Sequence, residues 1–424
     1  MKEHVQLIKR DVAYAFWVFS EQAAYLGLPR LVLFPLVAYI MGKENFGVFS
    51  FALSITLIIG MQPQMGLSTG LLRHFSEYQK ERRQIFLGTA LKMSHTVMLI
   101  IVVAGVLLSL IVGVLGMVMW NVLNCLIPLL ILLYYENQFL LILTEMRFLR
   151  QFRQRALWVT VRSVLGVLCG VIGAYFGGAI GLSWGYLLGN AVVYIAVRFQ
   201  YAPELTKVYD KQMATVLKSI WLQITIAGIL AVSIPYINRI ILGIYNSYAA
   251  VADFVAATTV IFLYLAPIYC FGGLIQSMLS QYSSMGQLSR RGKIYLAVIL
   301  LLGSFVLPGI MYLTGSFVMR HTFPQFGDES VRLLKILIWL FPSETISCLT
   351  RPFVYQFFPV KFIPIINLIS FIAILALALA IIPGYGASGA AWGYVIVNSF
   401  TALLWVGICL KRPLKHNIVG DAIQ

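Results

Sequence analysis

The stretch GAIGLSWGYLLGN, residues Gly178–Asn190, returns as GASGAAWGYVIVN at residues Gly386–Asn398. Seven of the thirteen positions are identical, and each is displaced by 208 residues. Chance similarity between two apolar segments fits poorly with a shared Trp-Gly-Tyr and a shared Asn in the same register. Because the displacement is close to half of the 424-residue chain, the sequence predicts two homologous halves, residues 1–205 and 206–424.

The composition is typical of an integral membrane protein. Hydrophobic residues make up 60% of the chain and charged residues 11%, whereas a soluble domain is about half apolar and a quarter charged. Apolar runs recur from end to end, and each is long enough to cross a hydrocarbon core of about 30 Å. We therefore expect an all-α membrane protein with about twelve transmembrane helices, near residues 12–41, 46–71, 85–112, 118–145, 156–176, 181–198, 219–244, 248–283, 294–316, 331–357, 361–382 and 387–410.

Lysines and arginines gather on one side of these spans. Of the 31 in the chain, 23 fall in loops or tails on that side, and this set includes Arg155, Arg198 and Arg351. The opposite loops hold only Lys43 and Arg320. The positive-inside rule makes the basic side cytoplasmic, with both termini on it. The net charge of +16 is thus first a topology signal and an attraction for membrane lipid, not a nucleic-acid-binding patch.

Six spans in each half give both halves the same orientation, related by a pseudo-two-fold axis along the membrane normal. Transporters in which two bundles rock about a central site have this layout. The repeated glycines suit a tight turn followed by close helix packing. In the first span we expect a hinge at Gly27, Pro29 and Pro35, and in the seventh at Pro235, because proline kinks or breaks a helix. These bends either line a cavity or are static kinks.

Ionisable residues inside the spans are the candidate site, because charge is costly in hydrocarbon. Cations outnumber acids there, and guanidinium groups bind phosphate bidentately, so an anionic cargo is favoured. The substrate-binding candidates are Arg30, Arg239, Lys92 and Arg162, and the ion-coupling candidates are Glu21, Asp253, Glu136 and Glu344. Each has another interpretation: Lys92 and Arg162 can extend to the membrane surface, and Asp253 can neutralise Arg239.

The segment from Ala38 to Tyr78 resembles the start of bacterial oligosaccharide flippases, as do the repeated Gly-Ala-x-Gly phrases. The matching features are a Gly-x-x-x-Phe-Gly turn, a Gly-Leu-Ser segment and a basic residue, found at Gly42, Phe46, Gly47, Gly66–Ser68 and Arg73. These flippases, called Wzx for O-antigen, belong to the polysaccharide transporters of the multidrug/oligosaccharidyl-lipid/polysaccharide (MOP) exporter superfamily.

The resemblance implies a V-shaped pair of six-helix lobes that works by alternating access. The implied cargo is an undecaprenyl-diphosphate-linked oligosaccharide, such as an O-antigen repeat unit, carried from the cytoplasmic to the periplasmic leaflet of the inner membrane. It also implies partners in the polymerase and chain-length proteins of the same pathway. We expect no metal or organic cofactor, and coupling to a proton or sodium gradient.

Two other functions fit parts of the sequence. A multidrug antiporter of the same superfamily carries cationic cargo and needs an acidic cavity, which the cation excess disfavours. An envelope enzyme acting on the same lipid-linked sugar needs polar residues on a substantial outer loop, and the longest, residues 317–330, is short. The sequence contains no HExxH or P-loop motif, and no GxSxG motif in the strand context that a hydrolase needs. A transporter is therefore the first hypothesis.

Overall fold

The computed structural model of the chain is helical throughout the part that it describes. The described residues are 16–17, 19–21, 23–60, 66–68, 71, 79–114, 120–149, 151–201, 209–279, 290–358 and 362–410. Several cations that define the predicted cytoplasmic side lie outside them, namely Lys2, Lys9, Arg10, Arg73, Arg150, Lys207, Lys361, Lys411, Arg412 and Lys415.

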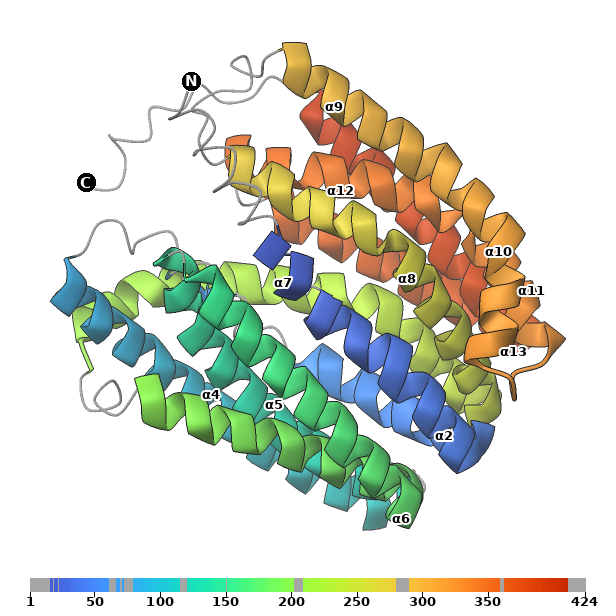
Figure 1. The fold of residues 1–424 in the computed structure, drawn as a ribbon, viewed down its shortest axis with the longest axis horizontal. Coiled ribbons are helices and arrows are strands. Elements are labelled where there is room, and N and C mark those ends of the chain that lie inside the picture. Colours follow the sequence, from blue (N-terminus) through green and yellow to red (C-terminus); the bar gives the residue numbers. More distant parts are fainter. Residues whose placement is uncertain are drawn as a thin grey trace.

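The helices run roughly parallel to one another along the long axis of the molecule (Figure 1). Three short π-helical segments, η1, η2 and η5, interrupt the α-helices. In chain order the elements are η1 (Ala23–Gly27), η2 (Pro29–Leu33), α2 (Phe34–Gly60), α4 (Lys80–Val114), α5 (Trp120–Phe148), α6 (Phe152–Tyr201), α7 (Lys211–Tyr245), α8 (Tyr248–Leu279), α9 (Arg290–Leu301), η5 (Leu302–Val306), α10 (Leu307–Thr322), α11 (Asp328–Leu337), α12 (Leu340–Phe357) and α13 (Phe362–Cys409).

The count of membrane crossings agrees with the sequence. Eight segments of the described chain are long and apolar enough to cross a membrane, or nine if the bent pair α11 and α12 is one span. Three of these segments contain non-helical glycines, at Gly42 in the first segment, at Gly177 and Gly178 in α6, and at Gly386 in α13. The chain doubles back at each of these breaks, so counting the three segments as two spans each turns nine into twelve. The chain is a multi-pass, all-α membrane protein.

The repeated phrase forms the same turn in both halves. Gly178 has φ 55° and ψ −137°, and Gly386 has φ 53° and ψ −135°, a conformation that residues with a Cβ rarely adopt. The packing after the turn differs between the copies. A Cβ at Gly185 would overlap the carbonyl oxygen of Cys169, whereas nothing lies within 4 Å of one at Gly393. The predicted turn is confirmed twice, and the predicted close packing at this position is found only in the first copy.

The first predicted hinge is irregular and the second is not. Pro29 begins η2, which follows η1 after a single residue, so the first span is underwound into wide turns around the proline. Pro35 is the second residue of α2, which continues η2 without a break, so its missing N–H removes a hydrogen bond from the middle of the helical run. Pro235 lies inside α7, which continues through it from Lys211 to Tyr245. The hinge function of these residues stays a prediction.

The tenth predicted span, residues 331–357, is broken. Helices α11 and α12 meet at an angle of 45° across Ile338 and Trp339. Pro342 lies in the first turn of α12 and cannot donate to the carbonyl oxygen of Ile338, which accepts instead from Phe341 N at 3.2 Å. Pro342 therefore interrupts the helical hydrogen bonds within a segment that hydropathy predicted as one continuous span.

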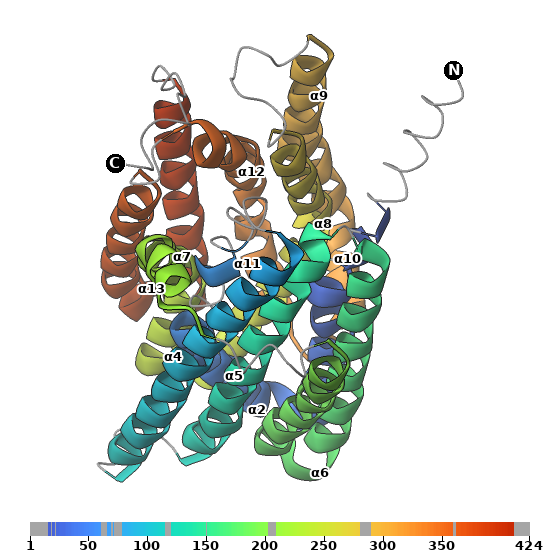
Figure 2. The same cartoon turned by 90° about the vertical axis from the view of Figure 1, so that its left-hand side faces the viewer.

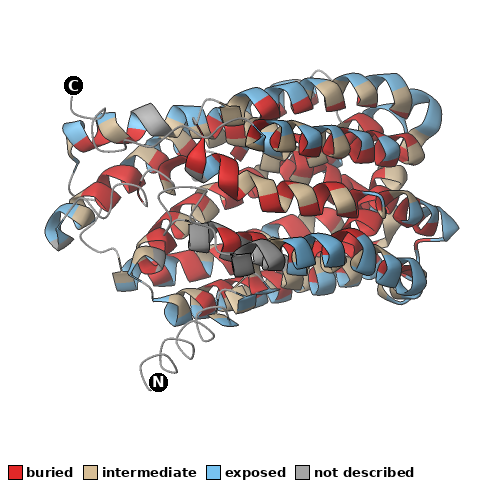
Figure 3. Cartoon of the chain, turned by 90° about the horizontal axis from the view of Figure 1, so that it is seen from above, coloured by how far each residue is buried: buried red, intermediate tan, exposed pale blue. Residues whose placement is uncertain are grey.

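We call the two ends of the bundle the hairpin end, where the turns at Gly42, Gly178, Asn246 and Gly386 lie, and the basic end, from which Lys80 and Lys211 begin their helices. Helices α4, α5 and α6 lie apart from α10, α12 and α13 in both views (Figures 1 and 2). Buried residues face inward and exposed residues face outward around the bundle (Figure 3). The assignment of the basic end to the cytoplasm stays a prediction from the charge pattern.

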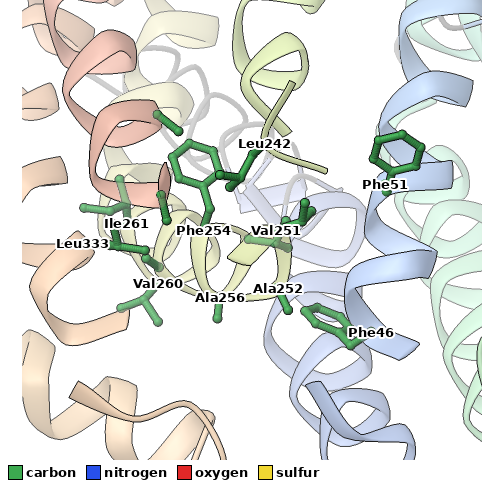
Figure 4. Packing of buried hydrophobic residues seen from close by; sticks show 14 of the residues in the cluster. Phe46, Phe51, Leu242, Val251, Ala252, Phe254, Ala256, Val260, Ile261 and Leu333 are labelled. Atoms are coloured by element: carbon green, nitrogen blue, oxygen red, sulfur yellow. The ribbon is translucent and has the colours of Figure 1, made fainter. Parts of the chain in front are cut away.

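At the hairpin end both halves share one hydrophobic core. This core joins Phe46 of α2 to Val251 and Phe254 of α8 and to Leu333 of α11 (Figure 4). Away from that end the buried residues form separate clusters. One is built mainly on α4, α5 and α6, and another, on α8, α12 and α13, is centred on Trp405. The first of these clusters also contains Met213 and Leu217 of α7, so the two halves share their main core at the hairpin end and touch again, through α7, near the basic end.

Polar contacts add to this junction. Lys43 Nζ lies 2.6 Å from Asp253 Oδ2, and Ser330 Oγ donates to the other oxygen of the same carboxylate at 2.7 Å. The side-chain amide of Gln325 donates to the carbonyl oxygen of Tyr39 at 2.9 Å. These contacts tie the turn after the first span to α8 and to the loop before α11, so the hairpin end is closed by both apolar and ionic contacts.

Candidate functional site

A cavity of about 170 Å³ lies among α7, α8, α12 and α13. Pro235 of α7 lines it, as predicted for a proline that faces a cavity. The wall combines aromatic, amide and charged side chains, which suits a ligand with both sugar-like and anionic parts. The other lining residues are Ala231, Ile234, Phe262, Tyr269, Glu344, Arg351, Tyr355, Asn367, Tyr394, Asn398, Thr401 and Trp405.

Glu344 is the acid of this cavity. It is only 6% exposed, and its Oε2 accepts a hydrogen bond from Tyr269 Oη at 3.2 Å. Arg351 lies seven residues later on α12, on the same face of the helix and on the same wall. No ion pair within 4 Å joins Glu344 to a cation among the described residues. The carboxylate is therefore held by a neutral donor and remains available for a proton or a cation.

Arg239 and Arg30 lie close together beside this cavity. The Arg30 guanidinium carbon stands 4.3 Å from the ring centroid of Phe262, a lining residue. Arg239 is 7% exposed, donates to Thr258 Oγ1 at 3.3 Å and keeps its buried Nε without a partner. The two guanidinium charges act on each other, and that of Arg239 acts on the hydroxyl of Tyr394. Neither arginine forms an ion pair with an acid of the described chain, which leaves two adjacent positive charges uncompensated.

Arg162 has a different environment. Its Nη2 lies 3.1 Å from Glu136 Oε1, which also accepts from Tyr25 Oη at 3.1 Å. The guanidinium carbon is 5.2 Å from the ring centroids of both Tyr25 and Phe139. The predicted substrate-binding arginine and the predicted coupling acid thus form an ion pair inside the first half, which leaves Nε and Nη1 of Arg162 buried without a hydrogen-bond partner among the described residues.

Two further predicted coupling acids are held in ion pairs. Glu21 Oε1 lies 2.8 Å from Arg155 Nη2, although the sequence assigned that arginine to a loop. Asp253 binds Lys43, so the interpretation in which Asp253 neutralises Arg239 is wrong. The physical reason is helix rotation, because Asp253 faces α2 and α11 while Arg239 faces Thr258, about one and a half turns further along α8.

Lys92 lies in a second cavity, of about 240 Å³, on α4, α5 and the second half of α6. It shares no lining residue with the cavity around Glu344. The four predicted substrate-binding residues therefore divide into the neighbours Arg30 and Arg239, the paired Arg162 and the separate Lys92.

The sequence interpretation missed Arg351 as a site residue. It counted Arg351 among the cytoplasmic cations although the predicted tenth span, residues 331–357, contains this position. A signal was present, since Glu344 and Arg351 are seven residues apart and a helix brings such residues to one face. Glu344 itself was predicted, and the structure adds Tyr269, Tyr394 and Asn398 around it.

A comparison with known protein families shows which family the chain belongs to. Residues 15–272, more than half of the chain, match the model of the family described as polysaccharide biosynthesis protein. The chain belongs to this family. No curated protein sequence matches it. The match confirms that the chain is a polysaccharide biosynthesis protein, the class that the resemblance noted in the sequence indicated.

Solved structures with this fold are transporters. Lipid II flippase MurJ, in an inward closed conformation, is similar with a TM-score of 0.71 and 14% identity over 95% of this chain and 88% of that one. A mutant of the MATE transporter VcmN from Vibrio cholerae gives a TM-score of 0.71 and 14% identity over 96% and 98%. A MOP superfamily transporter from Pyrococcus furiosus, described as having a binding pocket of reversed polarity, gives 0.66 and 14% over 92% and 93%. At this identity the likeness shows the fold alone.

Proposed function

We propose that this member of the family moves a polyprenyl-diphosphate-linked oligosaccharide, such as an O-antigen repeat unit, from the cytoplasmic to the periplasmic leaflet of the inner membrane. Arg30, Arg239 and Arg351 would bind the diphosphate, and the tyrosines and amides of the cavity would contact the sugars. The polyprenyl chain would stay in lipid. The family match and the fold of MurJ support the lipid-linked class of cargo.

The observation that carries this proposal is the unpaired state of Arg239. A guanidinium that is 7% exposed beside a second cation is costly unless an anion binds there. A diphosphate diester is a dianion, and three arginines with one glutamate leave a positive excess that matches it. The guanidinium fork binds phosphate oxygens bidentately, and the low dielectric of a buried site strengthens the attraction.

The arrangement of the two halves supports alternating access. They share their main core at the hairpin end, whereas toward the basic end the buried clusters on α4, α5 and α6 and on α8, α12 and α13 are distinct and only α7 joins the first of them, so cargo would enter from the basic side in this state. Release on the other side requires the contacts of Lys43 with Asp253 and of Phe46 with Phe326 to part. The wide turns around Pro29 offer the first span a place to bend.

Glu344 is our choice for the coupling residue. Of the four acids predicted for this role, Glu21, Glu136 and Asp253 are held in ion pairs. Glu344 lines the cavity beside Arg351 without one. Binding of a proton or a sodium ion there would increase the positive charge around the diphosphate, and release would lower it, so the ion gradient would bias loading and unloading of the cargo.

The test is flipping by purified protein in proteoliposomes. The probe is a fluorescent undecaprenyl diphosphate disaccharide, whose exposure to an impermeant quencher reports the leaflet. We expect Arg239→Gln and Arg30→Gln each to slow flipping at least about tenfold, since a lost charged contact costs more than 1.4 kcal/mol. Arg239→Lys keeps the positive charge but loses the guanidinium fork, so its flipping rate should lie between those of the wild type and Arg239→Gln. Arg320→Gln, at an exposed position of the hairpin end, is the matched control and should behave as wild type.

Full activity in both Arg30→Gln and Arg239→Gln, with normal insertion, would refute the assignment of the diphosphate site. The same vesicles also test the alternative function, a MATE-like drug antiporter. That alternative rests on the unpaired carboxylate of Glu344, which suits a cationic drug. Ethidium transport that depends on Glu344 and ignores both arginines would favour the antiporter instead.

A further inference from the structure

The second cavity carries a charge pattern that the diphosphate site does not explain. It contains three side chains able to hold a positive charge, Lys92 and His95 from α4 and Arg198 from α6. The remaining lining residues are neutral, and no carboxylate is among them. They are Leu91, Tyr134, Gln138, Ile142 and Tyr194.

Two tyrosines hold the basic groups in place. The Nδ1 atom of His95 lies 2.7 Å from Tyr134 Oη, and Arg198 Nη1 donates to Tyr194 Oη at 3.0 Å. Each contact uses one polar atom of the basic group, so the second ring nitrogen of His95 and the other donors of Arg198 stay available. Lys92 has no acidic partner in the described chain, and its ammonium lies 5.4 Å from the ring centroid of Tyr209.

The cavity is near the basic end of the bundle. At 1.5 Å per residue, Arg198 is about 5 Å from the end of α6 at Tyr201, and Lys92 about 18 Å from the start of α4 at Lys80. Half of a bilayer with its headgroups is about 20–22 Å thick, so both distances fall within one leaflet. A lipid headgroup can therefore reach the cavity without leaving its own leaflet.

Extension of a single lysine to the membrane surface does not account for this arrangement. In that case each cation would extend separately to the aqueous surface. Here, three basic groups from two helices line one cavity together with two tyrosine hydroxyls. Like charges that line one cavity repel each other. An anion between them removes the repulsion and supplies the missing acceptor, and phosphate suits Lys and Arg donors together.

We propose that this cavity is a second anion site, which binds a phosphate group of a membrane lipid at the basic end of the first half. Its ligand class is a phosphate ester. The source is either a resident anionic phospholipid or the diphosphate of a cargo lipid that docks before it moves inward. The inference goes beyond the proposed function, because the site shares no residue with the cavity at Glu344 and would exist whatever the cargo.

The experiment measures lipid binding to the purified full-length chain by native mass spectrometry. The probes are dioctanoyl phosphatidylglycerol, farnesyl diphosphate and the uncharged dioctanoylglycerol. The test variant is Lys92→Gln with Arg198→Gln. The matched control is Lys211→Gln with Lys218→Gln, which removes the same charge from exposed positions of α7 at the same end.

We expect the test variant to bind phosphatidylglycerol or farnesyl diphosphate at least about tenfold more weakly, and the control to change less than about twofold. Dioctanoylglycerol should show no difference. His95→Gln keeps the size of the side chain and should also weaken binding. This single variant keeps the test decisive if the double variant does not fold. Equal losses in test and control variants, or no loss in the test variant and in His95→Gln, would overturn the proposal.

Competition between the probes identifies the source. Displacement of phosphatidylglycerol by farnesyl diphosphate at lower concentration assigns the cavity to cargo docking, and the reverse order assigns it to a resident phospholipid. Arg239→Gln should leave binding in this cavity unchanged. Failure of the flipping test and failure of this one are therefore distinguishable.

Discussion

Glu136 and Glu344 occupy matching places in the two halves and have different surroundings. Each precedes the tyrosine of the repeated phrase, Tyr186 or Tyr394, by 50 residues. Each accepts a hydrogen bond from a tyrosine hydroxyl, at 3.1 and 3.2 Å. Only Glu136 also has an arginine in an ion pair. The same buried carboxylate is thus neutralised in one half and left open to a cavity in the other.

The difference follows from single positions in the repeat. Displacement by 208 residues places Ser370 where the first half has Arg162, and Arg351 where it has Leu143. The hydroxyl of Ser370 accepts from Thr401 at 2.7 Å instead of meeting an acid. Two positions thus account for the difference: Ser370 in place of an arginine leaves Glu344 without an ion pair among the described residues, and Arg351 adds a cation to the wall of its cavity.

The largest effect should come from breaking the ion pair of the first half. Arg162→Leu leaves Glu136 as an unpaired buried charge, and we expect a loss of about 3–5 kcal/mol in the free energy of unfolding. Removing both charges, in Glu136→Leu with Arg162→Leu, should restore most of it. Denaturation in detergent micelles measures both. Equal stability of the single variant and the wild type would contradict the structural function of this pair.

The two copies of the glycine phrase allow a second paired test. Gly185→Ala places a Cβ against the Cys169 carbonyl and should cost about 1–3 kcal/mol of stability through overpacking. Gly393→Ala meets nothing within 4 Å and should be neutral or stabilising by up to about 1 kcal/mol, since alanine favours a helix. Thermal unfolding of the two variants side by side decides it. A larger loss at Gly393 than at Gly185 would show that the copies pack in another way.

The glycines and the charges differ in how far sequence alone predicts them. The turns at Gly178 and Gly386 were predictable, because a glycine-rich phrase between two apolar runs needs a reversal that only glycine makes readily. The number of spans was also predictable, because the hydropathy of each segment depends only on its own residues. These are local properties, and neighbouring residues in the chain determine them.

Partners across helices were not predictable. Glu21 meets Arg155, and Asp253 meets Lys43, from segments far apart in the chain. Which charges meet depends on the rotation and depth of each helix, and an error of two residues in a helix end turns an inward side chain outward. The sequence therefore identified most of the charged residues that matter but could not say which of them are free.

The comparison of the glutamates also predicts different effects on transport. Glu344→Gln removes the exchangeable charge but keeps the acceptor for Tyr269, so stability should stay within about 1 kcal/mol of wild type. Gradient-driven flipping should fall about tenfold, toward the rate without a gradient. Flipping with and without an imposed proton or sodium gradient measures this. A variant that still responds fully to both gradients would exclude Glu344 as the coupling residue.

The smallest effect should separate the two repeated tyrosines. The hydroxyl of Tyr394 interacts electrostatically with Glu344 and Arg351, which line the cavity, and with Arg239 beside it. The hydroxyl of Tyr186 interacts electrostatically with Glu136 and Arg162, which form an ion pair with each other. Tyr394→Phe should therefore slow flipping about two- to fivefold, the size expected for one lost neutral hydrogen bond of about 0.5–1 kcal/mol. Tyr186→Phe should leave flipping unchanged. Equal slowing by both, measured in the same vesicles, would mean that the first half also contacts cargo and that its ion pair opens during transport.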